Sequence, residues 1–249
     1  MSFQHPGTIA DELSANVRKV IEHRSANSDR AKQKALGVSE IGEKCVRKLI
    51  YKMSGQAETN KSDPWASIQG TALHAWLADA FERFNDKDAP RFFIERRVEV
   101  NEGLVGTCDL FDTIDGVVID HKCVGSSSMQ KRKREGATDQ QRIQINLYGL
   151  AYEKMGFTVK KVALVFYPIG GRLDGVHTII EDYDRNLALA ALDRYEGIKA
   201  LFASLAPVEN PDKWPLIPAS PSSSCLFCPF YLPKSEDLSK GCPGEVNLL

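Results

Sequence analysis

Two carboxylates and one amine stand near each other in two β-rich segments of the chain. Asp109 ends the first segment, Asp120 and Lys122 lie in the second, and Asp115-Gly116 between them is a strong signal for a two-residue hairpin turn. Such a turn would place Asp109 opposite Lys122, with Asp120 diagonal to Asp109 on the same face. Two carboxylates in this arrangement can hold one divalent ion, and a lysine beside them suits phosphodiester hydrolysis. A structural ion pair between Asp109 and Lys122 would explain the same residues.

Other side chains extend this candidate site. His74 lies four residues after Gly70 on a predicted helix, and we expect the glycine to let that face approach the sheet closely. Two carboxylates with one imidazole suit Mg²⁺ or Mn²⁺. Gln144 and Tyr148 also lie four apart on one face of a later helix, and Glu95 on the preceding strand is a candidate ligand for a second metal. Each of these residues alone would equally be an ordinary core or surface residue.

The densest positive charge lies in a segment that we predict to be a polar loop over residues 125–139. It consists of Lys131, Arg132, Lys133 and Arg134. Such a run is often only solvated surface, but its place after the candidate metal strand suits neutralisation of a DNA phosphate backbone.

Four of the six cysteines have the distribution of metal ligands. Cys225 and Cys228 form a two-ligand clamp, Cys242 follows, and Cys45 stands far upstream. Thiolates at such spacing hold zinc or an iron–sulfur cluster. We expect Cys108 and Cys123 to pack as small apolar residues on or beside core strands.

The composition is that of an ordinary globular protein. The chain has 249 residues, 43% hydrophobic and 26% charged, and a net charge of −1, so any nucleic-acid binding must come from local patches. No apolar run reaches the roughly 20 residues that span a membrane, and the first residues lack a signal peptide's pattern. We therefore expect a cytoplasmic protein with no membrane partner.

The hydrophobic patterns predict an α/β or α+β fold. Thr8 is the predicted N-cap of the first helix and Ser39 that of the second. We expect helices over 8–36, 39–51, 64–84, 140–155 and 184–204, and strands over 91–100, 104–112, 116–123, 161–167 and 175–181. The chain divides into a helical region (1–64), a core (65–205) and a cysteine-rich segment (206–249).

In this order the motifs resemble the PD-(D/E)XK nuclease superfamily, and within it the RecB-like branch that includes the nuclease domains of RecB and AddB and the CRISPR-adaptation nucleases. The resemblance covers roughly residues 40 to 245. Four motifs carry it: Gly-x-x-x-His at Gly70–His74, Gly-x-x-Asp at Gly106–Asp109, Asp-x-Lys at Asp120–Lys122 and Gln-x-x-x-Tyr at Gln144–Tyr148. It implies a restriction-endonuclease-like core, with a central mixed sheet flanked by helices, and a cysteine-clasped appendage built from both chain ends.

The resemblance also implies residue roles. Metal would be held by His74, Asp109, Asp120 and the backbone carbonyl of His121, and Lys122 would polarise the attacking water and the phosphate. Gln144 and Tyr148 would contact the DNA backbone or organise the site.

Cys45, Cys225, Cys228 and Cys242 would bind a [4Fe–4S] cluster, with structural zinc as the alternative. Cys45 stands in a pattern like Cys-x-Arg-x-x-Tyr, with Tyr51 displaced by one residue, and the gap before Cys242 exceeds the family's usual one.

The expected function is that of a Mg²⁺- or Mn²⁺-dependent DNA nuclease, an exonuclease acting on single strands or DNA ends in recombination, repair or DNA processing. It would work alone or with a helicase or recombination partner. The alternatives are a catalytically silent iron–sulfur subunit that binds or scaffolds DNA, and an endonuclease specific for a sequence or a structure.

Overall fold

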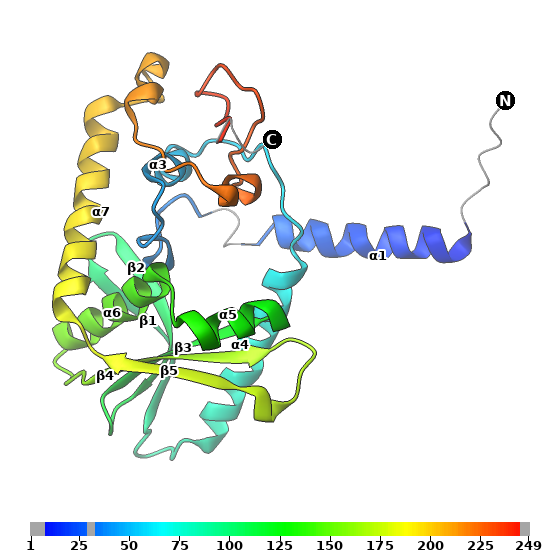
Figure 1. The fold of residues 1–249 in the computed structure, drawn as a ribbon. Coiled ribbons are helices and arrows are strands. Elements are labelled where there is room, and N and C mark those ends of the chain that lie inside the picture. The colour runs from blue at the N-terminus through cyan, green and yellow to red at the C-terminus, as the bar shows by residue number, and fades with distance from the viewer. Residues whose placement is uncertain (1–7, 29–32, 245–249) are drawn as a thin grey trace.

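A five-stranded mixed sheet forms the centre of the molecule (Figure 1), in a computed structural model that describes residues 8–28 and 33–244. Neighbouring strands are antiparallel except for the parallel pair β3–β4. In spatial order the strands are β1 (Phe92–Asn101), β2 (Leu104–Asp112), β3 (Val117–Val124), β4 (Lys161–Pro168) and β5 (His177–Asp182). The predicted α/β class with a mixed sheet flanked by helices is confirmed.

Helices cover both faces of this sheet. The side chain of Asp120 contacts α6 (Asp139–Lys154), whereas the next residue, His121, stacks on Phe81 of α4 (Trp65–Phe84). Because successive strand residues point to opposite faces, α4 and α6 lie on opposite sides of β3. The long helix α7 (Arg185–Leu205) packs against α6 as an outer layer.

The predicted basic loop is wrong. Residues Ser126–Glu135 form helix α5, which with α6 makes the crossover between the parallel strands β3 and β4. Met129 is the one buried side chain of α5, so the segment lacks the apolar stripe by which a helix is recognised in a sequence. Its lysines and arginines are nevertheless good helix formers.

The first helix is shorter than predicted. Helix α1 (Ile9–Ala26) begins at the expected N-cap, Thr8, and ends where the side chain and backbone of Asn27 both donate to the carbonyl oxygen of His23. Residues 29–32 of the predicted helix lie outside the described residues. The apolar stripe of α1 is exposed, and the helix projects away from the sheet (Figure 1). No helix within residues 8–28 and 33–244 has the length and apolar character needed to cross a membrane.

The second helix also begins later than predicted. A short 3₁₀ turn, η1 (Val38–Glu40), is followed by α3 (Val46–Ser54), whose N-cap is Cys45 rather than Ser39. Between α7 and residue 244 the chain is irregular apart from η3 (Pro211–Leu216) and η4 (Ser223–Phe227). These C-terminal segments pack beside α3 (Figure 1), so α3 and the C-terminal segments form one lobe.

The predicted two-residue hairpin turn is wrong as well. Pairing between β2 and β3 comprises only three residue pairs, from Asp112–Val117 to Leu110–Ile119, so the loop has four residues, 113–116. The reason is the Asp112 carboxylate, which accepts the amides of Ile114 and Asp115 and begins the turn earlier. The strands separate before Asp109, and it does not pair with Lys122.

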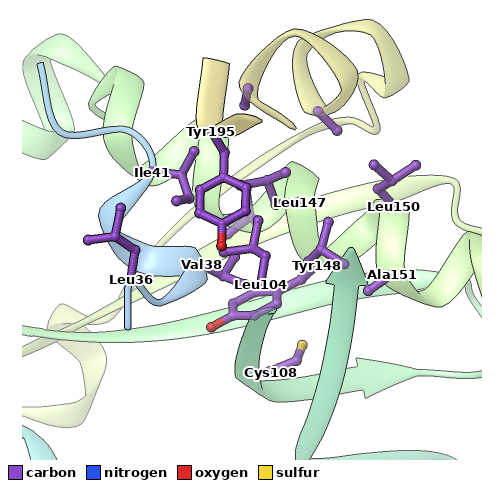
Figure 2. Close-up of a cluster of buried hydrophobic side chains, with 14 of the residues drawn as sticks. Leu36, Val38, Ile41, Leu104, Cys108, Leu147, Tyr148, Leu150, Ala151 and Tyr195 are labelled. Carbon is purple, nitrogen blue, oxygen red and sulfur yellow. The ribbon is translucent and has the colours of Figure 1, made fainter. Parts of the chain in front are cut away.

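The main core lies between the sheet, α6 and α7. Tyr148 of α6 is buried among Val38, Leu104 and Cys108 (Figure 2). A Cβ atom added at Gly106 on β2 would lie 2.8 Å from the ring of Tyr148 and 2.8 Å from Val38. Gly106 is therefore required by the close approach of this tyrosine to the strand.

Candidate active site

Three of the candidate ligands converge where α4 meets the sheet. His74 Nδ1 lies 3.4 Å from Asp109 Oδ1 and 3.6 Å from Glu95 Oε1. One ligand atom from each of the three residues lies within 4.8 Å of the others, a spacing that one cation can bridge. The other nitrogen, His74 Nε2, is 3.0 Å from the carbonyl oxygen of His121 and donates to it, which leaves Nδ1 as the nitrogen directed at the carboxylates.

The two carboxylates change the titration of this histidine. The hydrogen bond to Asp109, and then that to Glu95, raise the pKa of His74 to about 10 against the opposing effect of burial. In the metal-free protein the imidazole is therefore protonated at neutral pH, and it balances two negative charges.

Glu95 reaches this group through a distorted backbone. Its φ of 45° is in the left-handed region, which costs a residue with a side chain about 1 kcal/mol or more. Pairing of β1 with β2 is regular on both sides of Glu95 but absent at it, opposite Asp109. This local distortion has no signature in the sequence, which predicts Glu95 only as a ligand for a second metal and not beside His74 and Asp109.

Asp109 occupies the gap where β2 and β3 separate. Its Oδ2 accepts the backbone N–H of His121 at 2.7 Å, in place of a bond between the strands. The side chain of Asp109 is 9% exposed, so its charge is held in a nearly dry position beside His74.

Asp120 and Lys122 form a second part of the site on the α6 side. Lys122 Nζ lies 2.5 Å from Asp120 Oδ2, so the expected ion pair with Asp109 is replaced by one with Asp120. Gln144 joins the two residues, because its Nε2 donates to Asp120 Oδ1 at 2.7 Å and its Oε1 accepts from Lys122 at 3.2 Å. Burial raises the pKa of Asp120 to about 6 despite the charge of Lys122, and the Asp109 charge acts in the same direction as burial.

The remaining motif residues differ in their surroundings. Tyr148 is 3% exposed and packs against Gly106, so it supports the helix that carries Gln144. At Gly70 the expected close approach to the sheet is wrong, since an added Cβ would meet no atom within 4 Å outside its own helix. The side chain of His121, with Nδ1 3.2 Å from the Tyr167 hydroxyl, is buried next to β4.

A family model described as the PD-(D/E)XK nuclease superfamily matches residues 17–231 of this chain. The chain belongs to the PD-(D/E)XK nuclease superfamily. The matched span contains all four motifs, and the sheet with its flanking helices accords with this superfamily's fold. No curated protein matches the chain.

The solved structure of an exonuclease supports this fold for the PD-(D/E)XK protein, and a second exonuclease structure is also similar. An alkaline exonuclease from Laribacter hongkongensis is 15% identical, with a TM-score of 0.52, 75% of this chain covered and 97% of the other. A phage-related exonuclease from Haemophilus somnus 129PT is 15% identical, with a TM-score of 0.46 and coverages of 66% and 82%. At such identities the likeness concerns the fold alone.

The basic residues of this PD-(D/E)XK protein differ in their surroundings. Lys131 and Arg132 line a cavity next to the cysteines, whereas Arg134 pairs with Glu135 at 2.7 Å. Lys133 is exposed on the same helix.

The same cavity, of about 760 Å³, collects all four cysteines predicted to bind metal: Cys45, Cys225, Cys228 and Cys242. Cys242 reaches it because the chain turns back on itself after Cys228. The N–H of Cys242 donates to the carbonyl oxygen of Phe230, and its carbonyl oxygen accepts from Leu232. The long gap in the sequence is thus a loop whose two ends meet. The other two cysteines do not line this cavity; Cys108 is buried and Cys123 is partly buried.

Residues of α3 hold the C-terminal segment in place around these four cysteines; α3 and this segment together are called the cysteine lobe. Arg47 donates through Nε and Nη2 to the carbonyl oxygen of Ile217, and Tyr51 donates to that of Leu238 at 2.5 Å. The ring of Tyr51 stacks on Trp214 with a centroid distance of 4.3 Å. The arginine and tyrosine that follow Cys45 in the sequence therefore bind the C-terminal segment directly.

Proposed function

We propose that this protein is a divalent-metal-dependent deoxyribonuclease, an exonuclease that hydrolyses single-stranded DNA or DNA ends. The observation that carries the proposal is the convergence of His74, Glu95 and Asp109 next to a lysine held by Asp120 and Gln144. A buried carboxylate and a strained glutamate around one histidine are costly arrangements that a cation would stabilise.

The donor set suits the metal that the family implies. His74 Nδ1, Asp109 and Glu95 offer one nitrogen and two carboxylates, and Asp120 Oδ2, which pairs with the Lys122 ammonium, is a further buried oxygen close by. The His121 carbonyl, predicted as a further ligand, instead accepts from His74 Nε2, on the side of the ring away from the carboxylates. A bound Mg²⁺ or Mn²⁺ supplies a water of lowered pKa and offsets the charge of the phosphate. Mn²⁺ accepts the imidazole more readily.

Lys122 supplies the positive charge next to the scissile phosphate. Its ammonium is fixed by Asp120 and Gln144, so its position is set before the substrate arrives. Gln144 also prevents Asp120 from turning away, because it holds the other carboxylate oxygen.

The exonuclease mode is drawn from the alkaline exonuclease that shares this fold. We place the activity in recombination, repair or DNA processing, alone or with a helicase or recombination partner. The complete set of His74, Asp109, Asp120 and Lys122 argues against a silent subunit.

Digestion of end-labelled and circular DNA with Mg²⁺ or Mn²⁺ tests the proposal. We expect linear single strands to be shortened from an end and circular single strands to resist. Lys122→Ala and Asp109→Ala should lower the rate by at least about 100-fold, as loss of one transition-state contact does elsewhere. Lys161→Ala is the matched control. It removes an exposed lysine of β4 that pairs with Asp182 of β5, and it should cleave like the wild type.

Three results would count against the proposal. Cleavage by Lys122→Ala at the wild-type rate would show that the site is misassigned. Cutting of circular strands would favour an endonuclease. Binding without cleavage in either metal would favour a silent subunit.

We also propose that Cys45, Cys225, Cys228 and Cys242 hold a [4Fe–4S] cluster, as in the RecB-like branch. Four thiolates around one zinc would lie roughly 3.8 Å apart, given Zn–S bonds of about 2.3 Å. Among the residues that the structure describes, the only group of three or more such ligands within 4.8 Å is that of His74, so the sulfurs are spread more widely. Arg47 Nη1, 3.9 Å from Cys242 Sγ, would offset part of the negative charge that four thiolates give to either metal centre.

Anaerobic purification with metal analysis tests this assignment. We expect a brown protein with about four irons per chain and loss of iron in Cys242→Ala, with Cys123→Ala as the matched control. A colourless protein that contains zinc and no iron would contradict it. The division into a core over 65–205 with flanking regions 1–64 and 206–249 is part of the same proposal.

A further inference from the structure

Gly70 is a helix-interior glycine for which residues 8–28 and 33–244 provide no structural reason. It lies in the second turn of α4, where glycine is among the worst helix formers. An added Cβ there would meet nothing within 4 Å, and no positive φ requires glycine. Gly106, in contrast, is explained by its contact with Tyr148.

The open space at Gly70 adjoins the active site. Gly70 and His74 are four residues apart, so they lie on the same face of α4 at a separation of roughly 6 Å. His74 touches Asp109, Glu95 and the carbonyl of His121 on that face. The empty position is thus one helical turn from the residues proposed to act on the phosphate.

A second glycine beside the site shares this property. Gly125 follows Lys122 by three residues, has an ordinary extended backbone, and would also place a Cβ in open space. Among the described glycines without a positive φ, Gly197 on α7 is the third of this kind. Two of the three therefore lie within four residues in the sequence of a candidate active-site residue, on different elements.

We infer that Gly70 is kept free of a side chain by the substrate: the sugar–phosphate backbone of the DNA strand passes against α4 at this residue on its way to His74. This inference rests on the proposed nuclease function. The strand fits the space because a scissile phosphate at His74 has neighbouring nucleotides on either side, about one helical turn away. A Cβ that clashes with no protein atom would then clash with the bound strand.

The test compares substitutions at Gly70 with the same ones at Gly197. Gly70→Ala, Gly70→Leu, Gly197→Ala and Gly197→Leu should all fold, and the alanine variants should melt about 2–4 °C higher than the wild type. With a linear single-stranded oligonucleotide and Mn²⁺, the Gly197 variants should keep the wild-type kcat/KM. Gly70→Leu should lose about 10- to 100-fold, and Gly70→Ala less, because small displacements of a reacting group have effects of this size.

Binding of the same oligonucleotide in a Lys122→Ala background separates the possible outcomes. We expect the dissociation constant to rise with side-chain size at Gly70 and to stay constant at Gly197. If the background protein binds DNA and Gly70→Leu binds it equally well, this inference is wrong while the proposed function stands. If the wild type neither binds nor cleaves DNA, both are wrong.

Discussion

The packing of Tyr148 on Gly106 predicts how two motifs that are far apart in the sequence depend on each other. In Gly106→Ala the new Cβ would lie 2.8 Å from the Tyr148 ring and from Val38 Cγ2, at least about 0.7 Å closer than carbon atoms normally approach. Relief of such overpacking costs about 1–3 kcal/mol. We therefore expect the free energy of unfolding to fall by this amount, as measured by urea denaturation.

A double-mutant cycle identifies the cause. Val38→Ala removes one of the clashing atoms and costs about 1–3 kcal/mol by itself as a core truncation. In the double variant with Gly106→Ala, the loss should be smaller than the sum of the two losses by about 1 kcal/mol. Gly197→Ala, at a helical glycine with open space around it, is the control and should not destabilise the protein. A wild-type unfolding midpoint for Gly106→Ala, or strict additivity in the cycle, would refute the reasoning.

Three further predictions concern the site and the cysteine lobe. The pKa of His74 is raised to about 10, so a metal ion must displace a proton from it. The Mn²⁺ affinity measured by calorimetry should therefore rise about tenfold per pH unit from pH 7 to 9, and a constant affinity would contradict this. Without metal, the stability that His74 contributes to the fold is present below its unfolded pKa and is lost as the pH rises from 6.5 to 10. Gln144→Leu leaves Asp120 Oδ1 buried and unbonded, so urea denaturation should show a loss of about 1–3 kcal/mol, with a smaller loss for Gln140→Leu at the exposed end of the same helix. Tyr51→Phe removes the hydrogen bond to Leu238, so limited proteolysis should cut the 232–241 loop faster, and an unchanged pattern would exclude this role.

The sequence was sufficient for those elements whose apolar residues repeat regularly. The strands of the sheet and helices α4, α6 and α7 lie within two residues of the predicted ranges, because alternation and the helical stripe are strong there. The motif residues Asp120, Lys122 and Gln144 also meet as a group, since their elements were correctly predicted.

Other features depend on contacts that no local pattern encodes. The four-residue turn results from a side chain, Asp112, that competes for the backbone amides. Helix α5 has one buried residue and therefore no period to detect. The participation of Glu95 depends on a backbone distortion, and the open space at Gly70 depends on where other elements do not reach.

The contacts between α3 and the C-terminal segment also determine the order in which parts of the chain can fold during synthesis. Arg47 and Cys242 are in contact although they are 195 residues apart in the sequence. At about 5–20 residues per second on the ribosome, roughly 10–40 s pass between the synthesis of the two. The sheet, whose last strand ends at Asp182, can pair during this interval, whereas the cysteine lobe cannot close. Each newly made chain therefore passes through a stage in which all residues of the sheet have been synthesised and Cys242 has not.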